Sequence, residues 1–180
     1  LSNNVGTVEI GTVVNSVNLT WSYGSTEISQ SLNQGIGARP VGERSFTHTD
    51  TFTSDRTYTL TINDGTTVST PSTSINFRNR FHWGTDASAS LNSAAILALD
   101  NNEFRTNRSK TFEIDGNGEY LYVAYPEDFG AAQFRVNGLL NTAWTESIVS
   151  HTNASGHTEN YRVYRSNTIQ NGSNIQVEVF

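Results

Sequence analysis

The sequence predicts a mainly β protein built from two consecutive β-sandwich-like domains, the second of which carries one short helix. Three observations support this fold class. Short runs of alternating apolar and polar residues recur along the chain, which is the period of a strand with one buried face. Turn dipeptides such as Asp64-Gly65 separate these runs. Aromatic residues make up 11% of a chain with only 35% hydrophobic residues, and aromatic side chains suit thin β cores.

The size and charge of the chain narrow its class. The 180 residues are enough for two domains, since about 100 residues is a common domain size. The formal net charge is −6, and residues 81–180 carry six basic against eleven acidic residues, which gives −5. A nucleic-acid interface needs clustered positive charge, so nucleic acid is excluded as a partner. We interpret the acidity as a solubility feature, with a cationic ligand or a metal as the alternative.

Features missing from the sequence restrict the class of protein further. The chain has neither an apolar run of membrane-spanning length nor a signal-peptide pattern, so membrane insertion is not expected. It begins with Leu1 rather than Met, and we expect it to be processed or to be part of a longer protein. Because cysteine is absent, the chain can form neither disulfides nor thiolate metal sites.

Short strands at regular spacing are expected in the first domain, residues 1–79. Leu19 and Trp21 alternate inward in one strand, and the next, weaker strand contains Ile28 and Leu32. A Gly- and Pro-containing loop at 35–42 has the composition of an exposed connection. Asp64-Gly65 predicts a hairpin turn. The expected strands cover residues 5–14, 16–23, 26–34, 46–52, 58–62 and 67–77.

An aromatic pattern in this domain resembles known sandwich folds. Trp21 in NLTWS, and Tyr58 in TYTLTIND two residues before the inward Leu60, are similar to residues of fibronectin type III and immunoglobulin-like domains. In those folds such a Trp fills the core and such a Tyr occupies the corner that enters a late strand. The resemblance covers residues 5–77 and implies an immunoglobulin-like β-sandwich. It implies no site, because such sandwiches carry many functions.

A short polar joint and a helix are expected next. Arg78-Asn79-Arg80 is too short to be a free linker, and the second domain is expected to cover residues 80–180. A helix near residues 88–99 is predicted, with Asp86 or Ser88 as its cap. Its apolar stripe at helical spacing consists of Leu91, Ala94, Ala95, Ala98 and Leu99.

The stretch from Lys110 to Gly130 is expected to form the central hairpin of the second domain. One face of its second run carries Leu121 and Val123, and the other carries Tyr120 and Tyr122. This run is expected in the centre of a sheet, where the helix or a neighbouring subunit would cover the two tyrosines. The intervening DGNG segment predicts a tight turn. Further strands are expected to begin at Phe81 and to cover 133–140, 144–150, 159–164 and 174–180, with a turn at 153–156.

A second resemblance covers most of the chain. FHWG leading into a helix, YLYVAYP followed by EDFG, and YRVYRSN before a closing IQVEVF are similar to domains of bacteriophage virion proteins, especially tail fibre and tail appendage proteins. The preceding sandwich, from NLTWSYGSTEISQSLN through TYTLTIND, resembles a module that often precedes such a domain. The resemblance implies a viral structural protein on the virion that contacts other virion proteins and forms a trimer. No heptad repeat in the sequence imposes that number.

Metal binding is not expected. Asp115, Asn117 and Glu119 alternate like part of a calcium loop, but most acidic positions of an EF-hand loop are missing. A plain turn is therefore favoured, with a weak metal ion near Asp115 as the alternative. His151 and His157 can approach each other across the turn at 153–156, but a third protein ligand is missing.

Catalysis is not expected either. The chain lacks both Cys and a G-x-S-x-G motif. Carboxylate pairs such as Asp100 with Glu103, or Glu127 with Asp128, lie close together in the sequence. A glycosidase needs two carboxylates that face each other across a cleft. We therefore expect no enzymatic activity and no cofactor.

Aromatic and polar side chains of the second domain are the candidate ligand-binding residues. Most aromatic side chains are core residues, but a flat aromatic surface can bind sugar or protein. Loops carry recognition on β scaffolds, and the turns around Asn117, Phe129 and Asn153 are expected to cluster at one end. The candidates are Trp83, Asn117, Tyr120, Tyr122, Phe129, Trp144 and His157.

These patterns, together with the resemblances, predict a non-enzymatic structural or adhesive component of a bacteriophage particle. It would be a tail fibre or another virion appendage that contacts a host cell-surface glycan or protein. The acidity of the second domain favours a neutral or cationic target over an anionic polysaccharide. The alternative is a carbohydrate-binding or spacer module of a secreted bacterial enzyme, where the same sandwich architecture is common.

Overall fold

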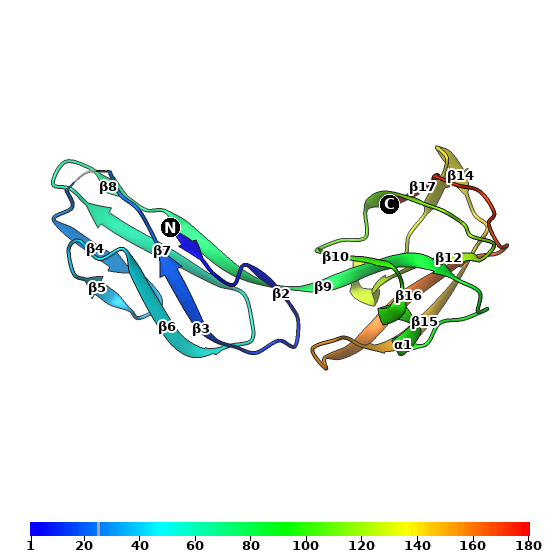
Figure 1. Ribbon diagram of the computed structural model, residues 1–180, viewed down its shortest axis with the longest axis horizontal. Coiled ribbons are helices and arrows are strands. Elements are labelled where there is room, and N and C mark those ends of the chain that lie inside the picture. Colours follow the sequence, from blue (N-terminus) through cyan, green and yellow to red (C-terminus); the bar gives the residue numbers. More distant parts are fainter. Residues whose placement is uncertain (25) are drawn as a thin grey trace. The chain divides into compact units, whose positions relative to one another are not determined.

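The computed structural model describes residues 1–24 and 26–180 (Figure 1). Within these ranges the chain is mainly β with one short α-helix, as predicted. It divides into two compact units, Leu1–Phe77 and Arg78–Phe180. The expected boundary lay after residue 79. No helix in the described ranges combines the length and the apolar character that crossing a lipid bilayer requires.

The first unit is a sandwich of two antiparallel sheets. Its strands are β1 (Ser2–Asn3), β2 (Thr7–Glu9), β3 (Val14–Thr20), β4 (Ser29–Leu32), β5 (Gly37–Arg39), β6 (Ser45–Phe52), β7 (Arg56–Asn63), β8 (Val68–Ser69) and the first part of β9 (Ser72–Asp86). One sheet has the strand order β1-β3-β6. The other contains β9-β7-β4-β5, with β8 paired to β7 and β2 to β9.

The core of the first unit lies between these two sheets. Leu19 of β3 and Leu60 of β7 have no exposed surface. Trp21 directly follows β3, and its Nε1 donates a hydrogen bond to Gln30 Oε1 of β4 at 3.0 Å. This bond satisfies the indole N–H, which would be costly to bury without a partner. The predicted core position of Trp21 is confirmed.

Tyr58 also lies in this core, but it does not make the contact of a tyrosine corner. In that motif the phenol bonds to upstream backbone. Here the Tyr58 hydroxyl lies 3.0 Å from His48 Nδ1 of β6, which belongs to the opposite sheet. Its ring also packs edge-on against His48 and Phe52. The contact of the Tyr58 hydroxyl therefore differs from the one expected in an immunoglobulin-like domain, because its partner is a side chain of the opposite sheet and not upstream backbone.

Ile28 was expected within a strand at 26–34, but β4 begins only at Ser29, and the Ile28 side chain is 62% exposed. The buried neighbour is Glu27, which is 4% exposed. Arg44 Nη2 donates to Glu27 Oε2 at 3.0 Å, and this guanidinium lowers the pKa of Glu27 to about 2. Glu27 and Ile28 both precede β4 and its regular alternation, and the hydrogen bonds of Glu27 to Arg44 and to the Gly42 N–H hold its carboxylate inward while Ile28 faces solvent.

Two expected segments of the first unit are subdivided. The predicted exposed loop at 35–42 contains β5, which pairs with β4. The predicted strand at 5–14 breaks between β2 and β3. The break occurs because Gly11 adopts a φ of 94° and the Thr12 N–H bonds to the Glu9 carbonyl, which makes a turn.

The hairpin predicted at Asp64-Gly65 is confirmed, since β7 pairs with β8 across it. Asp64 Oδ1 accepts the backbone N–H groups of Thr66 and Thr67 at 2.9 and 2.8 Å. These hydrogen bonds lower the pKa of Asp64 to about 2. The ionised carboxylate therefore stabilises the turn at neutral pH.

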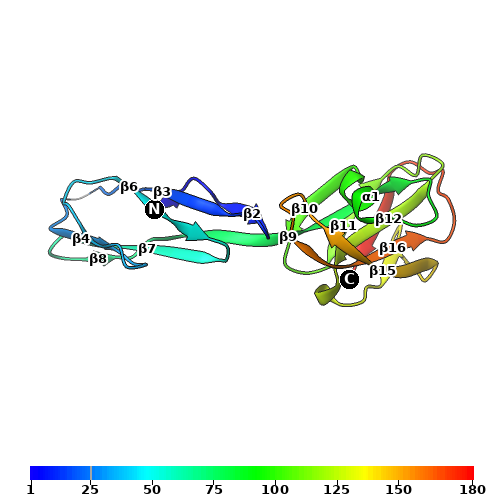
Figure 2. The same cartoon turned by 90° about the horizontal axis from the view of Figure 1, so that it is seen from below.

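The second unit has a helix and two sheets. Its elements are the later part of β9, α1 (Ser93–Ala98), β10 (Asn101–Arg105), β11 (Lys110–Ile114), β12 (Tyr120–Pro126), the 3-10 helix η1 (Glu127–Phe129), β13 (Phe134–Val136), β14 (Leu139–Asn141), β15 (Trp144–Thr152), β16 (Thr158–Ser166) and β17 (Ile175–Val179). The helix-covered sheet has the order β15-β16-β12-β9-β10, and the outer sheet has the order β11-β17-β13-β14. Figure 2 shows α1 beside the helix-covered sheet.

The predicted central position of β12 is confirmed, because it lies between β9 and β16. Leu121 and Val123 face the outer sheet, in a core shared with β11 and β17. Tyr122 faces the opposite way and packs with Ile96 and Leu99. The helix and the residues around it therefore cover the tyrosine face of the strand, which is one of the two covers expected.

The predicted hairpin between Lys110 and Gly130 is wrong. β11 pairs with β17 in the outer sheet, whereas β12 belongs to the helix-covered sheet. Asn117 and Gly118 have positive φ angles of 55° and 77°, as turn residues should. However, the N–H groups of Gly116 and Gly118 bond to carbonyls of the segment 170–172. The turn therefore carries the chain from one sheet to the other instead of closing a two-stranded ladder.

The helix is shorter and begins later than predicted. Its N-cap is Asn92, whose Oδ1 accepts the Ala95 N–H at 2.9 Å. The predicted caps are wrong because β9 continues to Asp86, and the Asp86 carboxylate accepts the Ser88 N–H in the following turn. The apolar stripe also differs from the prediction. Ile96, which was not part of the predicted stripe, is fully buried, and Leu91 and Leu99 are buried as well. Ala94 and Ala98, which were part of it, are exposed.

Two further segments of the second unit differ from the prediction. Arg78-Asn79-Arg80 is not a loop, because it lies within β9, and its last two residues pair with β10. The segment 133–140 was expected as one strand and contains β13 and the start of β14. Asn137 and Gly138 have φ angles of 50° and 79°, which suit a tight hairpin turn between these strands.

Candidate binding site

The candidate ligand-binding residues do not form a single site. Asn117 precedes the first residue of β12, and the strand pairings place Trp144 near that same end. Phe129 follows the last residue of β12, and the turn with Asn153 and His157 lies at that other end. A strand of seven residues separates these ends by roughly 20 Å at about 3.3 Å per residue. The expectation that the three turns cluster is therefore wrong.

Tyr122 does not belong to a surface site, because its side chain is only 1% exposed. Its hydroxyl donates to the Ser88 carbonyl at 2.6 Å, so both its ring and its polar group have partners inside the unit. Tyr120 is half-buried, and the Arg165 guanidinium lies 4.7 Å from its ring centroid. This cation–π contact stabilises Tyr120 against the sheet.

Trp83 and Phe129 mainly support the core. The Trp83 ring packs on Phe112, with ring centroids 5.4 Å apart, and Lys110 Nζ lies 4.1 Å from its ring centroid. Phe129 is stacked on Tyr125, with centroids 6.2 Å apart and an interplanar angle of 18°. Both rings are half-buried. Their contacts therefore account for most of their surface without a ligand.

The histidines are arranged differently from the sequence interpretation. His157 lies exposed in its turn, with Nε2 3.9 Å from Glu159 Oε1. His151 is buried and faces His82 instead, with ring centroids 5.6 Å apart. The ring partner of the buried His151 is therefore His82, and its Nδ1 lies 3.3 Å from Ser93 Oγ. Burial lowers the pKa of both His82 and His151, so both rings are neutral at pH 7.

The acidic residues around the DGNG turn serve the local backbone. Asp115 Oδ1 accepts the Asn174 N–H at 2.7 Å, and the backbone of Glu119 pairs with Gln170. These contacts tie the turn to the segment before β17. In the described ranges, no group of three or more His, Asp or Glu side chains is arranged to hold a metal ion.

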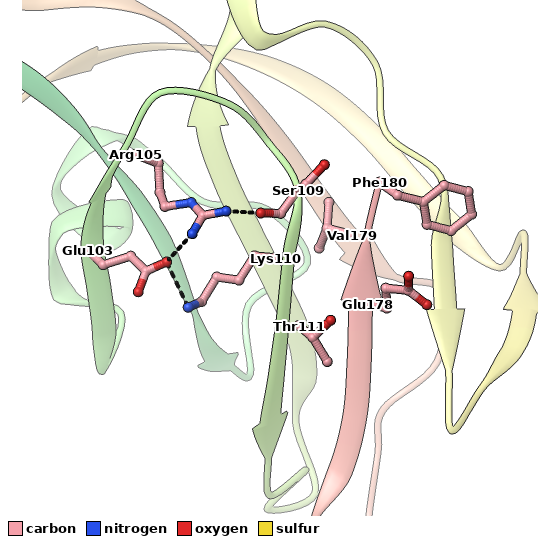
Figure 3. Close-up of a pocket in the computed structure, with 8 residues that line it drawn as sticks. All are labelled: Glu103, Arg105, Ser109, Lys110, Thr111, Glu178, Val179 and Phe180. Carbon is pink, nitrogen blue, oxygen red and sulfur yellow. Dashed lines mark hydrogen bonds and ion pairs between the residues drawn. The ribbon is translucent and has the colours of Figure 1, made fainter.

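One surface hollow, of about 400 Å³, lies beside β10, β11 and the end of β17. Glu103 Oε1 lies 2.8 Å from Lys110 Nζ and 3.3 Å from Arg105 Nη1, as Figure 3 shows. At the other side of its lining, Glu178 Oε2 is paired with Arg135 Nη1 at 2.9 Å. Because these opposite charges compensate one another, the hollow offers little net charge to a ligand.

A second hollow contains Trp144 and is the best candidate binding site. Its volume is about 310 Å³, and it lies where β13, β14, β15 and β16 come together. The Trp144 ring is stacked on the buried Phe134 ring, with centroids 4.2 Å apart and an interplanar angle of 17°. We call it the Trp144 hollow. It is lined by Ala132, Gln133, Phe134, Leu140, Asn141, Thr142, Trp144, Glu146 and Tyr164.

Polar groups in the Trp144 hollow have fixed positions. The Tyr164 hydroxyl donates to Glu146 Oε2 at 2.8 Å and accepts the Ala132 N–H at 3.0 Å. Burial raises the pKa of Tyr164, so the phenol keeps its proton at neutral pH. Arg162 Nη1 bonds to Glu146 Oε1. The carboxylate of Glu146 is therefore oriented from two sides, and a guanidinium offsets its charge.

The sequence interpretation identified only Trp144 among the residues of this hollow. From the sequence, Glu146 has the pattern of a solvent-facing strand residue and Phe134 that of a core-facing one, so neither was selected. The sequence offered one signal, because two apolar residues, Leu139 and Leu140, directly follow the Asn137-Gly138 turn. In the structure both are exposed, at 75% and 63%. Two apolar residues after a tight turn on a polar surface indicate a patch that can contact a ligand or partner.

Comparison with protein-family models, curated proteins and solved structures finds no match for this chain. A functional assignment therefore depends on the geometry of the hollow and on the sequence resemblances.

Proposed function

We propose that this chain is a non-enzymatic adhesive or structural component of a bacteriophage particle, a tail fibre or another virion appendage. The Trp144 hollow carries the adhesive part of this proposal. It joins a fixed aromatic ring, an exposed Leu140 and an oriented carboxylate on a sandwich of two sheets. Such a mixture of apolar surface and a few placed polar groups is typical of ligand sites. The phage assignment is supported by the sequence resemblance.

In this role the chain acts on the virion surface, among other virion proteins, and contacts a host cell-surface glycan or protein. Several copies on one particle would multiply a weak contact by avidity. Trimers are expected from the resemblance to phage fibres. The exposed Leu139 and Leu140 on β14 are compatible with a contact between copies, and mass measurement of the chain in solution tests that association.

Electron microscopy of the phage particle, with an antibody raised against the chain, tests the location. We expect label on an appendage of the particle. Purified particles that lack the chain, by mass spectrometry as well as by labelling, would refute the proposal. Adhesion is tested separately, by binding of the fluorescent chain to host cells. Trp144→Ala should reduce this binding, while Leu97→Ala, at an exposed leucine of α1 outside the hollow, should leave it unchanged.

The same hollow also supports the second candidate, a carbohydrate-binding or spacer module of a secreted bacterial enzyme. The neighbouring coding sequence distinguishes the two. A catalytic domain in the same parent chain favours the enzyme module, whereas adjacent tail or capsid genes favour the virion component.

A further inference from the structure

The chemical character of the Trp144 hollow indicates which ligand class it accepts. Its volume of about 310 Å³ lies at the lower end of small-molecule sites, which span roughly 300–1,000 Å³. A smaller cavity of about 60 Å³ adjoins it, and both cavities are lined by Asn141 and Trp144. The indole therefore contributes to the lining of both cavities. This space suits one compact ring rather than an extended peptide.

The indole offers the apolar side of such a ligand a flat surface. Phe134 is 3% exposed and is stacked against Trp144, so the orientation of the indole is fixed before a ligand arrives. An aromatic face carries partial negative charge, which attracts the weakly positive C–H groups on one face of a pyranose. Leu140 extends the apolar surface at the edge of the hollow.

The polar groups of the hollow match hydroxyl groups. Two contacts occupy part of the Glu146 carboxylate, one from Tyr164 and one from Arg162, and an ionised carboxylate has about four acceptor positions. Asn141 Oδ1 accepts the Ala143 N–H at 2.8 Å. The Asn141 NH₂ group is therefore the part of this amide that can donate to a ligand. A sugar hydroxyl can donate to Glu146, and a neighbouring hydroxyl can accept from Asn141.

The charge of the second unit selects against an acidic sugar. Residues 81–180 have six basic and eleven acidic residues, and the Arg162 guanidinium near the hollow is already bound to Glu146. The carboxylate of a uronate or sialate would be repelled by the Glu146 carboxylate, and Arg162, which is paired with Glu146, would not be available to bind it. A neutral sugar meets no such repulsion.

We propose that the Trp144 hollow is a subsite for one neutral pyranose, with the C–H face of the sugar on the Trp144 indole and two of its hydroxyls bound by Glu146 and Asn141. This inference rests on the proposed adhesive function and specifies its ligand class.

Nuclear magnetic resonance of the ¹⁵N-labelled chain tests the subsite directly. Each of the three tryptophans contributes one indole N–H signal, and Trp144→Phe identifies the signal of Trp144. The probes are the methyl glycosides of glucose, galactose, mannose and N-acetylglucosamine, titrated to high millimolar concentration. We expect at least one glycoside to shift the Trp144 signal saturably. The signal of Trp21, which is 6% exposed and bonded to Gln30, should not move.

Variants with an intact fold separate binding from stability. Glu146→Gln keeps an acceptor for Tyr164 but removes the charge, and we expect affinity to fall about tenfold, as for a hydrogen bond to a charged group. Trp144→Ala should abolish saturable binding. If Trp144→Ala fails to fold, Trp144→Phe should retain weakened binding. Leu97→Ala removes an exposed leucine of α1 that is outside the lining of the hollow, and it should leave the affinity unchanged.

Several outcomes would overturn the subsite. These are an unshifted Trp144 signal with every glycoside in a well-folded chain, tighter binding of methyl glucuronide than of the neutral glycosides, or unchanged affinity in Glu146→Gln. If host-cell binding still depends on Trp144 in that case, the adhesive function stands and only the sugar assignment falls. Conversely, saturable glycoside binding by a chain absent from virions would retain the subsite and reject the phage role.

Discussion

At the residue scale, Gly116 shows how one position can require glycine without a positive φ. A Cβ built there would lie 2.3 Å from the Gln170 carbonyl oxygen, because the turn N–H groups bond closely to that segment. Backbone cannot move aside as a flexible side chain can. The close approach of two chain segments, and not turn geometry alone, therefore fixes this residue.

We predict that Gly116→Ala lowers the free energy of unfolding by about 3 kcal/mol or more, the upper range for overpacked sites. Urea unfolding followed by circular dichroism measures this. The matched control is Gly24→Ala, since a Cβ at Gly24 meets nothing within 4 Å, and it should change stability by no more than about 0.5 kcal/mol. Equal effects of the two substitutions would contradict the close approach.

The buried His82 makes stability depend on pH. Desolvation, the main cause, lowers its folded-state pKa to about 3, below the ordinary value of about 6.5 expected in the unfolded chain. Between these values the unfolded state binds more protons. The stability contributed by neutral His82 is therefore fully present above about pH 6.5 and is lost as the pH falls toward about 3. His151 acts in the same direction.

We predict that His82→Leu flattens the decline of the unfolding free energy between pH 6.5 and 4, measured by urea titrations at several pH values. One such histidine contributes a slope of up to about 1.4 kcal/mol per pH unit. Leu97→Ala is the control, because it removes an exposed side chain without a titratable group and should leave the slope as in the parent chain. A slope that is the same in His82→Leu and the parent would contradict the buried, neutral state of His82.

At the element scale, α1 is a short helix whose role is to cover a sheet. Six residues are too few for a stable isolated helix, so packing stabilises it. Ile96 has no exposed surface and packs in the core beneath the helix, whereas the adjacent Leu97 is 39% exposed. The two side chains are equal in size, and they differ in burial.

We predict that Ile96→Ala costs about 2–5 kcal/mol of unfolding free energy, the range for large-to-small changes in cores. Leu97→Ala should cost less than about 1 kcal/mol, because alanine is a better helix former and little buried surface is lost. Thermal and urea unfolding of both variants measure the difference. A comparable loss in both would mean that α1 does not depend on this core.

At the scale of the whole molecule, the two units have separate hydrophobic cores. Leu60 belongs to the core of Leu1–Phe77, and Ile96 belongs to a core of Arg78–Phe180. β9 contributes residues to both units, with Ile75 in the first core and Phe81 in the second. Each unit therefore has its own source of stability, and a cavity in one core should weaken that unit first.

We predict that Leu60→Ala accelerates amide hydrogen exchange in β3, β6 and β7, and leaves the protected amides of β12 and β16 unchanged. The physical reason is that the substitution opens a cavity in one core only. Exchange measured by mass spectrometry resolves the two sets of peptides, and Ile96→Ala should give the reverse pattern. Equal acceleration in both units would show that they unfold together.

Four features could be predicted from the sequence: the β class, the helix region, the turn at Asp64-Gly65 and the central place of β12. These are local properties, because alternation and turn chemistry are encoded within a few residues. The sequence also included Trp144 among seven candidate binding residues, because an aromatic side chain can provide a flat surface for a ligand, but it did not distinguish Trp144 from the other six.

The pairing of the strands and the grouping of residues around the Trp144 hollow depend on the three-dimensional fold. The DGNG turn looks like a hairpin turn by composition, but its hydrogen bonds go to a segment more than fifty positions later in the chain. Tyr122 could not be separated from a surface aromatic until α1 covered it. The Trp144 hollow combines residues from four strands. Such contacts depend on long-range packing, which local periodicity does not contain.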